Sequence, residues 1–166
     1  FGFELSQEGF AKELHKMKHR GPDGYGIWNC KEDNVWMGHR RLAILDTDHR
    51  ANQPMVFNDR YVIVYNGEIY NYLELRKELQ QEGINFKTTS DTEVLLHMMI
   101  LKGPSALNRL NGMWAFALYD LIEKTLFLSR DRLGKKPMYI VQRNNCLAFA
   151  SEMKSLYHLF NGISYN

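Results

Sequence analysis

The chain has 166 residues and a net charge of +2, and 45% of its residues are hydrophobic and 13% aromatic. This length and composition are typical of one folded globular domain and exclude an intrinsically disordered chain. Lysine and arginine are scattered among aspartate and glutamate, so the sequence has no basic stripe of the kind that binds nucleic acids.

Membrane and metal-binding functions find no support in the sequence. No apolar run approaches the roughly 18–20 residues that a membrane-spanning helix needs, and the first ten residues do not resemble a signal peptide. The two cysteines, Cys30 and Cys146, are far apart and offer neither a disulfide framework nor zinc-ligand spacing, and the six histidines are dispersed. We therefore expect no metal site, no membrane association and a reducing, cytoplasmic location.

The N-terminal part of the chain is predicted to form a helix and a hairpin. Phe10, Leu14 and Met17 recur at helical spacing, which predicts an amphipathic helix over about 7–18 that stops before Gly21-Pro22. Two short strand-like runs follow, over residues 25–29 and 35–39, and polar residues join them. This pattern predicts a β-hairpin.

A short apolar run from Tyr61 to Tyr65 predicts a strand that is covered on both faces. It is followed at once by Asn66, Gly67 and Glu68, which supply an amide, a bare backbone and a carboxylate. Because Asn-Gly is a common turn pair, a plain turn at the end of the strand is one interpretation. The alternative is a small polar cradle for a reaction intermediate.

Two helices with clear end signals are predicted next. Asn71 is expected to cap the first helix, which ends at Gly83. Ser90 and Glu93 have the spacing of a capping box for the second helix, which runs to about residue 102 and stops at a Gly-Pro pair.

Two more hairpins, over about 113–131 and 137–151, and a helix over about 152–160 complete the predicted elements. The strands come in antiparallel pairs, without the strand–helix alternation of a parallel doubly wound sheet. The run from Trp114 to Tyr119 is apolar at nearly every position, so both of its faces need to be covered. We therefore predict a single α+β domain over residues 1–166, in which two sheets pack on each other with helices outside.

Eight segments combine glycine, proline, amide or charged residues with apolar runs in unusual ways. They are HRGPDGYGIW (19–28), GHRRLAILD (38–46), NQPM (52–55), YNGEIYN (65–71), SDTEVL (90–95), LNGMWAFALYD (110–120), SRDRLGKKPMY (129–139) and FASEMKSL (149–156). In this order they resemble the glutaminase domain of asparagine synthetase and its class II glutamine amidotransferase relatives, over nearly the whole chain. The segments RGPD and NGEIYN are the more specific pair, and SRDRLGKKPMY points to the asparagine synthetase branch.

The resemblance implies the N-terminal-nucleophile (Ntn) hydrolase fold, a four-layer αββα sandwich of two mainly antiparallel sheets flanked by helices. It implies hydrolysis of glutamine to glutamate and ammonia, and transfer of the ammonia to an ATP-dependent synthetase domain that makes asparagine from aspartate. We expect no cofactor in this domain, since ATP and magnesium belong to the synthetase domain, which these residues do not contain. The expected partners are glutamine and that domain; oligomeric state is left open, with a homodimer as one alternative.

The resemblance also assigns an oxyanion hole. Amide hydrolysis passes through a tetrahedral oxyanion, which needs preorganised hydrogen-bond donors. Asn66 and Gly67 match the positions whose side-chain amide and backbone N–H meet that oxygen. Glu68 is expected to contribute through its backbone or through local polar contacts.

Free glutamine carries a carboxylate and an ammonium that must be paired. Arg41 matches the position that holds the carboxylate, which suits a planar guanidinium, and a surface salt bridge is the structural alternative. Asp91 matches the position that holds the ammonium, although an aspartate in the first turn of a helix also complements the helix dipole. Leu42 and Ile44 are expected to wall the pocket or, alternatively, to belong to the core.

The start of the chain departs from the family pattern. The family begins with a cysteine whose thiolate attacks the amide and whose free α-amine serves as the base, whereas this sequence begins Phe1-Gly2-Phe3. Cys30 and Cys146 lie inside the chain, without a free amine or a neighbouring histidine, so neither is expected to replace it.

Two accounts of this departure remain open. In the first, the sequence lacks the first few residues of the native protein, which carry the cysteine. In the second, the domain is a catalytically inactive scaffold of the kind found in β-lactam synthetases. The glutamine-pocket residues favour the first account. A binding module for another amino acid is a further alternative.

Overall fold

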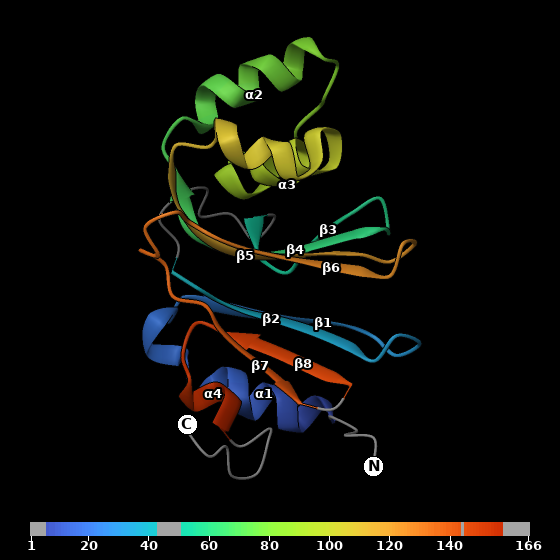
Figure 1. Cartoon of the computed structure of the whole chain (residues 1–166), viewed down its shortest axis with the longest axis vertical. Coiled ribbons are helices and arrows are strands. Elements are labelled where there is room, and N and C mark those ends of the chain that lie inside the picture. The colour runs from blue at the N-terminus through green and yellow to red at the C-terminus, as the bar shows by residue number, and fades with distance from the viewer. Residues whose placement is uncertain (1–5, 43–50, 144, 158–166) are drawn as a thin grey trace.

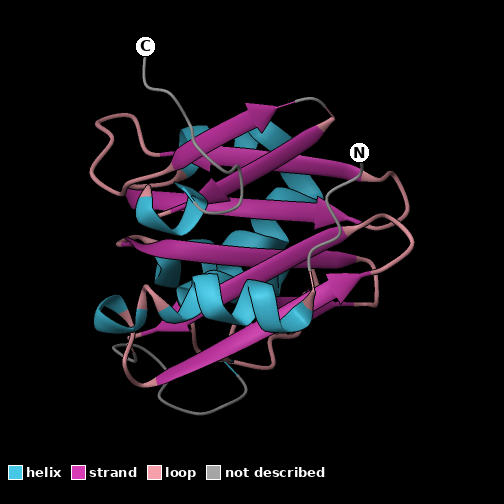
Figure 2. Cartoon of the chain, turned by 90° about the horizontal axis from the view of Figure 1, so that it is seen from below, coloured by secondary structure: helices cyan, strands magenta, loops and turns pink. Residues whose placement is uncertain are grey.

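The computed structural model describes residues 6–42, 51–143 and 145–157, which form a sandwich of four layers (Figure 1). Two helices form the first layer, a four-stranded sheet the second and two β-hairpins the third, and two further helices cover the other side. Figure 2 shows this last side from below, with helices lying across the strands. The predicted α+β sandwich is confirmed.

The four-stranded sheet is antiparallel throughout, in the order β3-β4-β5-β6. Its strands are β3 (Met55–Phe57), β4 (Tyr61–Ile69), β5 (Gly112–Asp120) and β6 (Thr125–Arg130). Side chains along β5 point alternately to its two faces. Trp114, Phe116 and Leu118 enter the core between the sheet and the helices over residues 72–102. Ala117 and Tyr119 enter the core between the sheet and the hairpins. This alternation explains a strand that is apolar at nearly every position.

The first helical layer contains α2 (Tyr72–Gln81), α3 (Asp91–Lys102) and the 3-10 segment η3 (Gly103–Arg109). Helix α3 is buried at every position from Asp91 to Met99, because it lies directly on the sheet. The Ser90 hydroxyl accepts a hydrogen bond from the N–H of Glu93 and so caps the start of α3. The helix ends at Gly103, which has a positive φ of 58°.

The hairpin layer contains β1 (Gly24–Cys30), β2 (Val35–Arg41), β7 (Tyr139–Arg143) and β8 (Cys146–Ala150). It is covered by α1 (Gln7–His15), the 3-10 turn η1 (Lys18–Arg20) and α4 (Lys154–Tyr157). Met37 of β2 and Phe149 of β8 pack in the core between the two strand layers. The hairpins predicted from the sequence are therefore confirmed.

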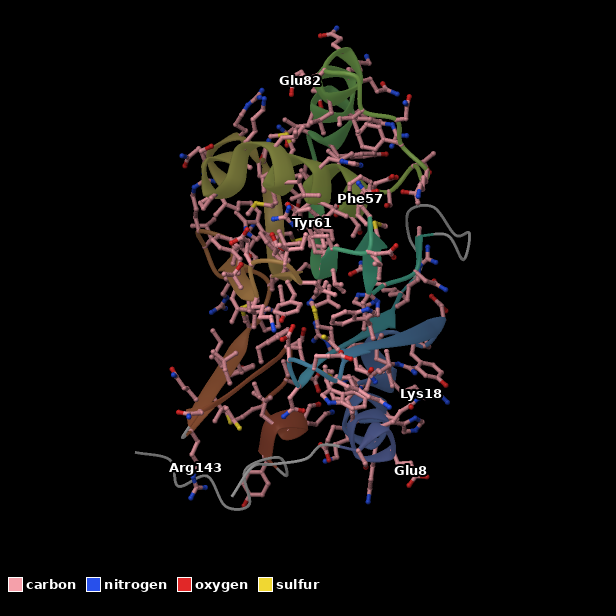
Figure 3. All side chains as sticks on the ribbon, turned by 90° about the vertical axis from the view of Figure 1, so that its right-hand side faces the viewer. Glu8, Lys18, Phe57, Tyr61, Glu82 and Arg143 are labelled. Carbon is pink, nitrogen blue, oxygen red and sulfur yellow. The ribbon has the colours of Figure 1, made fainter. Side chains whose placement is uncertain are left out.

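Side chains at the layer boundaries hold the sandwich together. In Figure 3, Phe57 and Tyr61 lie between the four-stranded sheet and the helices, where they pack against the buried side chains shared by the sheet, α2 and α3. On the other face of the sheet, Asp33 in the β1–β2 turn accepts the Tyr119 hydroxyl at 2.7 Å and the Lys124 ammonium at 2.6 Å. This pair of contacts joins the hairpin layer to the sheet.

Strand β4 differs from its prediction in a way that matters for function. It does not stop at Tyr65 but continues to Ile69, so Asn66-Gly67-Glu68 is part of the strand, and the turn interpretation is wrong. The strand continues because β5 pairs with it over its whole length, down to Gly112.

Smaller differences occur at helix ends. Helix α1 ends at His15 rather than residue 18, because a 3-10 turn takes over. Asn71 precedes α2 but its side chain does not cap the helix. Its amide instead donates to the Arg109 carbonyl and accepts the N–H of Asn111, tying α2 to the start of β5. The predicted last helix begins at Lys154, and the part beyond residue 157 lies outside the described residues.

Within the described ranges, no helix has the length and apolar character needed to cross a membrane. The same residues contain no group of three His, Cys, Asp or Glu side chains arranged to hold a metal ion. Cys30 and Cys146 are both free thiols.

Candidate functional site

Two of the residues singled out in the sequence, Gly67 and Asp91, lie along one edge of β4. Strand β3 begins at Met55, which pairs with Ile63, so β3 pairs only with the part of β4 from Tyr61 to Ile63. Where β3 is missing, the N–H of Tyr65 donates to Gln53 Oε1 at 2.5 Å, and the N–H of Ile69 donates to Asp91 Oδ2 at 3.0 Å. Side chains therefore replace the absent neighbour along this edge, which we call the open edge of β4.

Gly67 lies between these two bonded positions. Because N–H groups two residues apart in a strand point the same way, the N–H of Gly67 faces the open edge, as those of Tyr65 and Ile69 do. A side chain here would place its Cβ 2.3 Å from the Met113 carbonyl oxygen and 2.9 Å from Trp114 Cα. The close approach of β4 and β5 therefore requires glycine at this position.

The side chain of Asn66 lies on the opposite face of the strand from those of Tyr65 and Ile69. It lines a cavity, together with His39 and Ser151, that extends from β4 and β5 past β2 and β8 to helices α1 and α4. Its Nδ2 donates to Ser151 Oγ at 3.4 Å, a long and therefore weak bond that a better acceptor can replace. Glu68 is half-buried and, two residues further on, shares this face of β4.

Asp91 is the first residue of α3 and is buried, with 6% of its surface exposed. Its Oδ2 accepts the Tyr65 hydroxyl at 2.8 Å in addition to the N–H of Ile69. Burial raises the pKa of Asp91 above its usual value, while the hydrogen bonds from Ile69 and Tyr65 act in the opposite direction. A carboxylate that only complements a helix dipole would not need to be buried against β4, so the dipole does not account for its position.

Gln53 is a site residue that the sequence analysis missed. It is buried, its Oε1 accepts the N–H of Tyr65, and its Nε2 donates to Thr92 Oγ1 at 3.3 Å. The available signal was the NQPM segment, which places two amides directly before a short strand. Tyr65 and Thr92 were likewise overlooked, because an apolar strand and a helix start account for both without any role in a site.

Arg41, the last residue of β2, is joined to the same group of residues. It is 9% exposed, and its Nη1 donates to Asn52 Oδ1 at 2.5 Å. The neighbouring Arg40 instead donates to the Gly21 carbonyl and lies over the ring of Tyr25. Arg41 is therefore buried rather than on the surface, and it has interactions besides its bond to Asn52. A structural role for its charge stays the alternative to glutamine binding.

His39 connects the two strand layers next to the site. Its Nε2 lies 3.1 Å from the Tyr65 carbonyl oxygen. Burial lowers the pKa of His39 to about 4, and the nearby Arg41 guanidinium acts in the same direction. The imidazole is therefore neutral at pH 7, and its Nε2–H donates to the strand that carries Asn66 and Gly67.

The two predicted wall residues fare differently. Leu42 follows the end of β2 and is 55% exposed, so it is not a core residue and can contact a ligand only from the rim. Ile44 lies outside the described residues, and its role stays a prediction. The site as described offers a guanidinium, a carboxylate and strand N–H donors, a set that suits a small ligand with both charges and an amide.

Comparison with known proteins agrees with the sequence resemblance. The family model described as a glutamine amidotransferase domain matches residues 2–164. The chain is 43% identical to asparagine synthetase (glutamine-hydrolyzing) 3 of Bacillus subtilis, over 84% of this chain and 23% of that protein. It is 43% identical to asparagine synthetase B (glutamine-hydrolyzing) of Escherichia coli, over 88% of this chain and 26% of that protein. The chain thus spans about a quarter of the length of these relatives.

A solved structure of the glutamine phosphoribosylpyrophosphate amidotransferase from B. subtilis, in complex with ADP and GMP, has the same fold. The TM-score is 0.77 over 94% of this chain and 41% of that one, at 24% sequence identity. At this identity the likeness concerns the fold alone. It confirms the four-layer Ntn sandwich predicted from the sequence.

Proposed function

Because the chain belongs to the glutamine amidotransferase domain family, we propose that it binds glutamine at the open edge of β4. We further propose that an N-terminal cysteine of the family type, which these 166 residues do not contain, hydrolyses the side-chain amide to glutamate and ammonia. One observation carries this proposal. The N–H of Gly67 faces the open edge between the Tyr65–Gln53 bond and the Ile69–Asp91 bond. A backbone donor held between two side-chain acceptors can bind a substrate oxygen without any rearrangement of the strand.

Gly67 and Asn66 supply the two donors of the proposed oxyanion hole. The Gly67 N–H is fixed by the pairing of β4 with β5, and the Asn66 amide makes only a weak bond to Ser151. Donors of this kind typically contribute a factor of about 100–1000 each to the rate of acyl transfer. The preorganised strand backbone makes Gly67 the better oriented of the two.

The charged ends of glutamine are assigned to Arg41 and Asp91. The buried Arg41 guanidinium would pair with the substrate carboxylate. We assign the Asp91 carboxylate, whose Oδ2 accepts the Tyr65 hydroxyl and the N–H of Ile69, to the substrate ammonium. Leu42, Ile44 and Glu68 complete the proposed lining of the pocket.

The nucleophile that the family uses is the thiolate of its N-terminal cysteine. Cys30 is a poor substitute, because its Sγ lies 3.4 Å from Glu32 Oε2 and 3.5 Å from Asp33 Oδ2. Burial and these two carboxylates raise the pKa of the Cys30 thiol, which leaves less of the reactive thiolate at neutral pH.

We further propose that the ammonia passes to an ATP-dependent synthetase domain, with aspartate as the acceptor and asparagine as the product. The support is that the relatives are asparagine synthetases of which this chain spans about a quarter. ATP and Mg²⁺ would be held by that domain. The two free cysteines support a reducing, cytoplasmic location.

Calorimetric titration with L-glutamine tests the binding proposal. The unmutated chain should bind, and Arg41→Ala and Asp91→Ala should each weaken binding about 100-fold or more, because each leaves a substrate charge unpaired in a buried site. Arg40→Ala is the matched control and should retain the affinity. A lack of glutamine binding by the unmutated chain would contradict the proposal. Glutamine binding without glutamate release by the full protein would instead support the inactive-scaffold alternative.

A further inference from the structure

We propose that Gln53 is a positioning residue, which holds the open edge of β4 at a fixed distance from Asp91 and so sets the preference for ligands that carry an α-ammonium. This inference rests on the proposed function, because it concerns how that site recognises glutamine. Gln53 need not touch the ligand to act in this way.

Gln53 lies where the antiparallel pairing of β3 with β4 would continue beyond Met55. Met55 pairs with Ile63, and continuing that antiparallel register by two residues puts Gln53 opposite Tyr65. The backbone carbonyl of Gln53 is turned away from β4, because a Cβ on Gly26 of β1 would lie only 2.2 Å from its oxygen. The Gln53 side chain therefore takes the N–H of Tyr65 in place of a backbone carbonyl.

The nitrogen of the same side-chain amide bonds to helix α3. Nε2 of Gln53 donates to Thr92 Oγ1 at 3.3 Å, a bond about as long as that from Asn66 to Ser151 but buried, so that water does not compete for it. Thr92 follows Asp91 in the first turn of α3. One planar group thus bonds both to the strand next to Asn66 and to the helix turn that carries Asp91. Gln53, Tyr65 and Thr92 are all buried, and so are the two hydrogen bonds between them.

The chemistry of the carboxamide suits both bonds. The Gln53 carboxamide can accept from a backbone N–H with its oxygen and donate to a hydroxyl with its nitrogen, in one plane and without charge. Methionine has a similar length but supplies no donor. A methionine at position 53 would leave the buried N–H of Tyr65 and hydroxyl of Thr92 without their partner, which favours a shift of α3 relative to β4.

The measurement is the ratio of two affinities in the full chain, one for L-glutamine and one for glutaramate. Glutaramate has the amide and the carboxylate of glutamine but no α-amine, so it does not need Asp91. In Gln53→Met the affinity for glutamine should fall about tenfold more than the affinity for glutaramate, the size expected for the loss of one buried hydrogen bond. A purely structural role would weaken both ligands equally and leave the ratio unchanged.

Two variants of Thr92 keep the proposal testable if Gln53→Met does not fold. Thr92→Val removes the hydroxyl that accepts from Gln53 and should lower the ratio of the glutamine affinity to the glutaramate affinity. Thr92→Ser keeps this hydroxyl and should keep the ratio of the unmutated chain. Gln80→Met, on the exposed face of α2, is the control for the side-chain exchange and should leave the ratio unchanged.

An unchanged ratio in Thr92→Val, or in a folded Gln53→Met, overturns the role of Gln53 while leaving the proposed function intact. Failure of the unmutated chain to bind glutamine overturns both. A lower ratio in Gln53→Met and Thr92→Val, together with an unmutated ratio in Thr92→Ser, supports the proposal.

Discussion

The hydroxyl of Tyr65 donates a 2.8 Å hydrogen bond to Oδ2 of Asp91, which joins the middle of β4 to the first residue of α3. The ring of Tyr65 lies in the core beneath α2 and α3, beside Gly67, and its hydroxyl reaches the Asp91 carboxylate. Because the acceptor is a buried carboxylate, this bond connects the packing of the core to the charge proposed to bind the ammonium of glutamine.

Replacing Tyr65 with phenylalanine is expected to weaken glutamine binding about tenfold or more. The change removes one donor to the Asp91 carboxylate, and hydrogen bonds to charged groups typically contribute about 1.5–3 kcal/mol. Tyr119→Phe is a closely matched control, because its hydroxyl also donates to an aspartate, Asp33, but far from the open edge of β4. Both variants should lower the thermal midpoint of unfolding, but only Tyr65→Phe should lower the affinity measured by calorimetry; equal affinities would refute the connection.

Glutamine binding is expected to weaken as pH falls, with a midpoint above the usual aspartate pKa of about 3.9. Burial raises the pKa of Asp91, and only the ionised carboxylate attracts an ammonium group. Titrations between about pH 4 and 8 locate the midpoint, with circular dichroism confirming that the chain stays folded. The affinity for glutaramate should change less over the same range, and identical pH profiles for the two ligands would contradict the assignment.

Asp91→Asn is expected to abolish glutamine binding and yet to equal or exceed the thermal stability of the unmutated chain at pH 7. Since the pKa of Asp91 is higher in the folded chain, the folded state holds more protons between the unfolded and folded pKa values. The free energy of unfolding therefore falls as pH rises through that window, and the ionised form costs stability above it. Differential scanning calorimetry without ligand is the measurement. A clear loss of stability in Asp91→Asn would contradict the expectation that the ionised Asp91 carboxylate destabilises the fold.

Glu93→Gln is expected to lower the free energy of unfolding at pH 7 by about 3 kcal/mol. The Glu93 carboxylate accepts the N–H of Lys87 at 2.8 Å and both the N–H and the hydroxyl of Thr88 at 2.7 Å. Burial acts to raise its pKa, but His97 and these donors outweigh burial and lower it to about 2. This stabilisation is therefore complete above about pH 4.5 and disappears as pH falls towards 2.

Urea unfolding at pH 7 and at pH 3 tests this pH dependence, since the difference between Glu93→Gln and the unmutated chain should shrink at the lower pH. Glu82→Gln is the control, because Glu82 forms only an exposed ion pair with Lys102 and should change the free energy by less than about 1 kcal/mol. A constant difference at both pH values would disprove the ionic origin of the effect.

Gly67→Ala is expected to destabilise the fold by about 2 kcal/mol or more and to abolish glutamine binding, because the added Cβ meets the backbone of β5. Gly24→Ala is the matched control within a strand, since its Cβ would lie 3.8 Å from the Arg41 Cβ, an ordinary contact. Urea unfolding of both variants provides the comparison. Similar stabilities for the two would show that β4 and β5 can separate at this point.

Local signals in the sequence were sufficient for most of the secondary structure. Turn residues at 30–34 and the spacing of Ser90 to Glu93 act within a few residues, so the hairpin and the helix start could be predicted. The end of β4 could not, because its length depends on pairing with a strand about 50 residues later in the chain.

The sequence by itself determined the fold class, the family and the positions Arg41, Asn66, Gly67 and Asp91, because alternation, turn chemistry and motif order are written along the chain. Their roles in binding remain predictions. Only the tertiary structure decided that Gln53 belongs with them. The buried N–H groups on the open edge of β4 must find acceptors, and those acceptors come from segments 12 and 22 residues away. Which side chain meets that need depends on how the layers pack, and no local pattern records it.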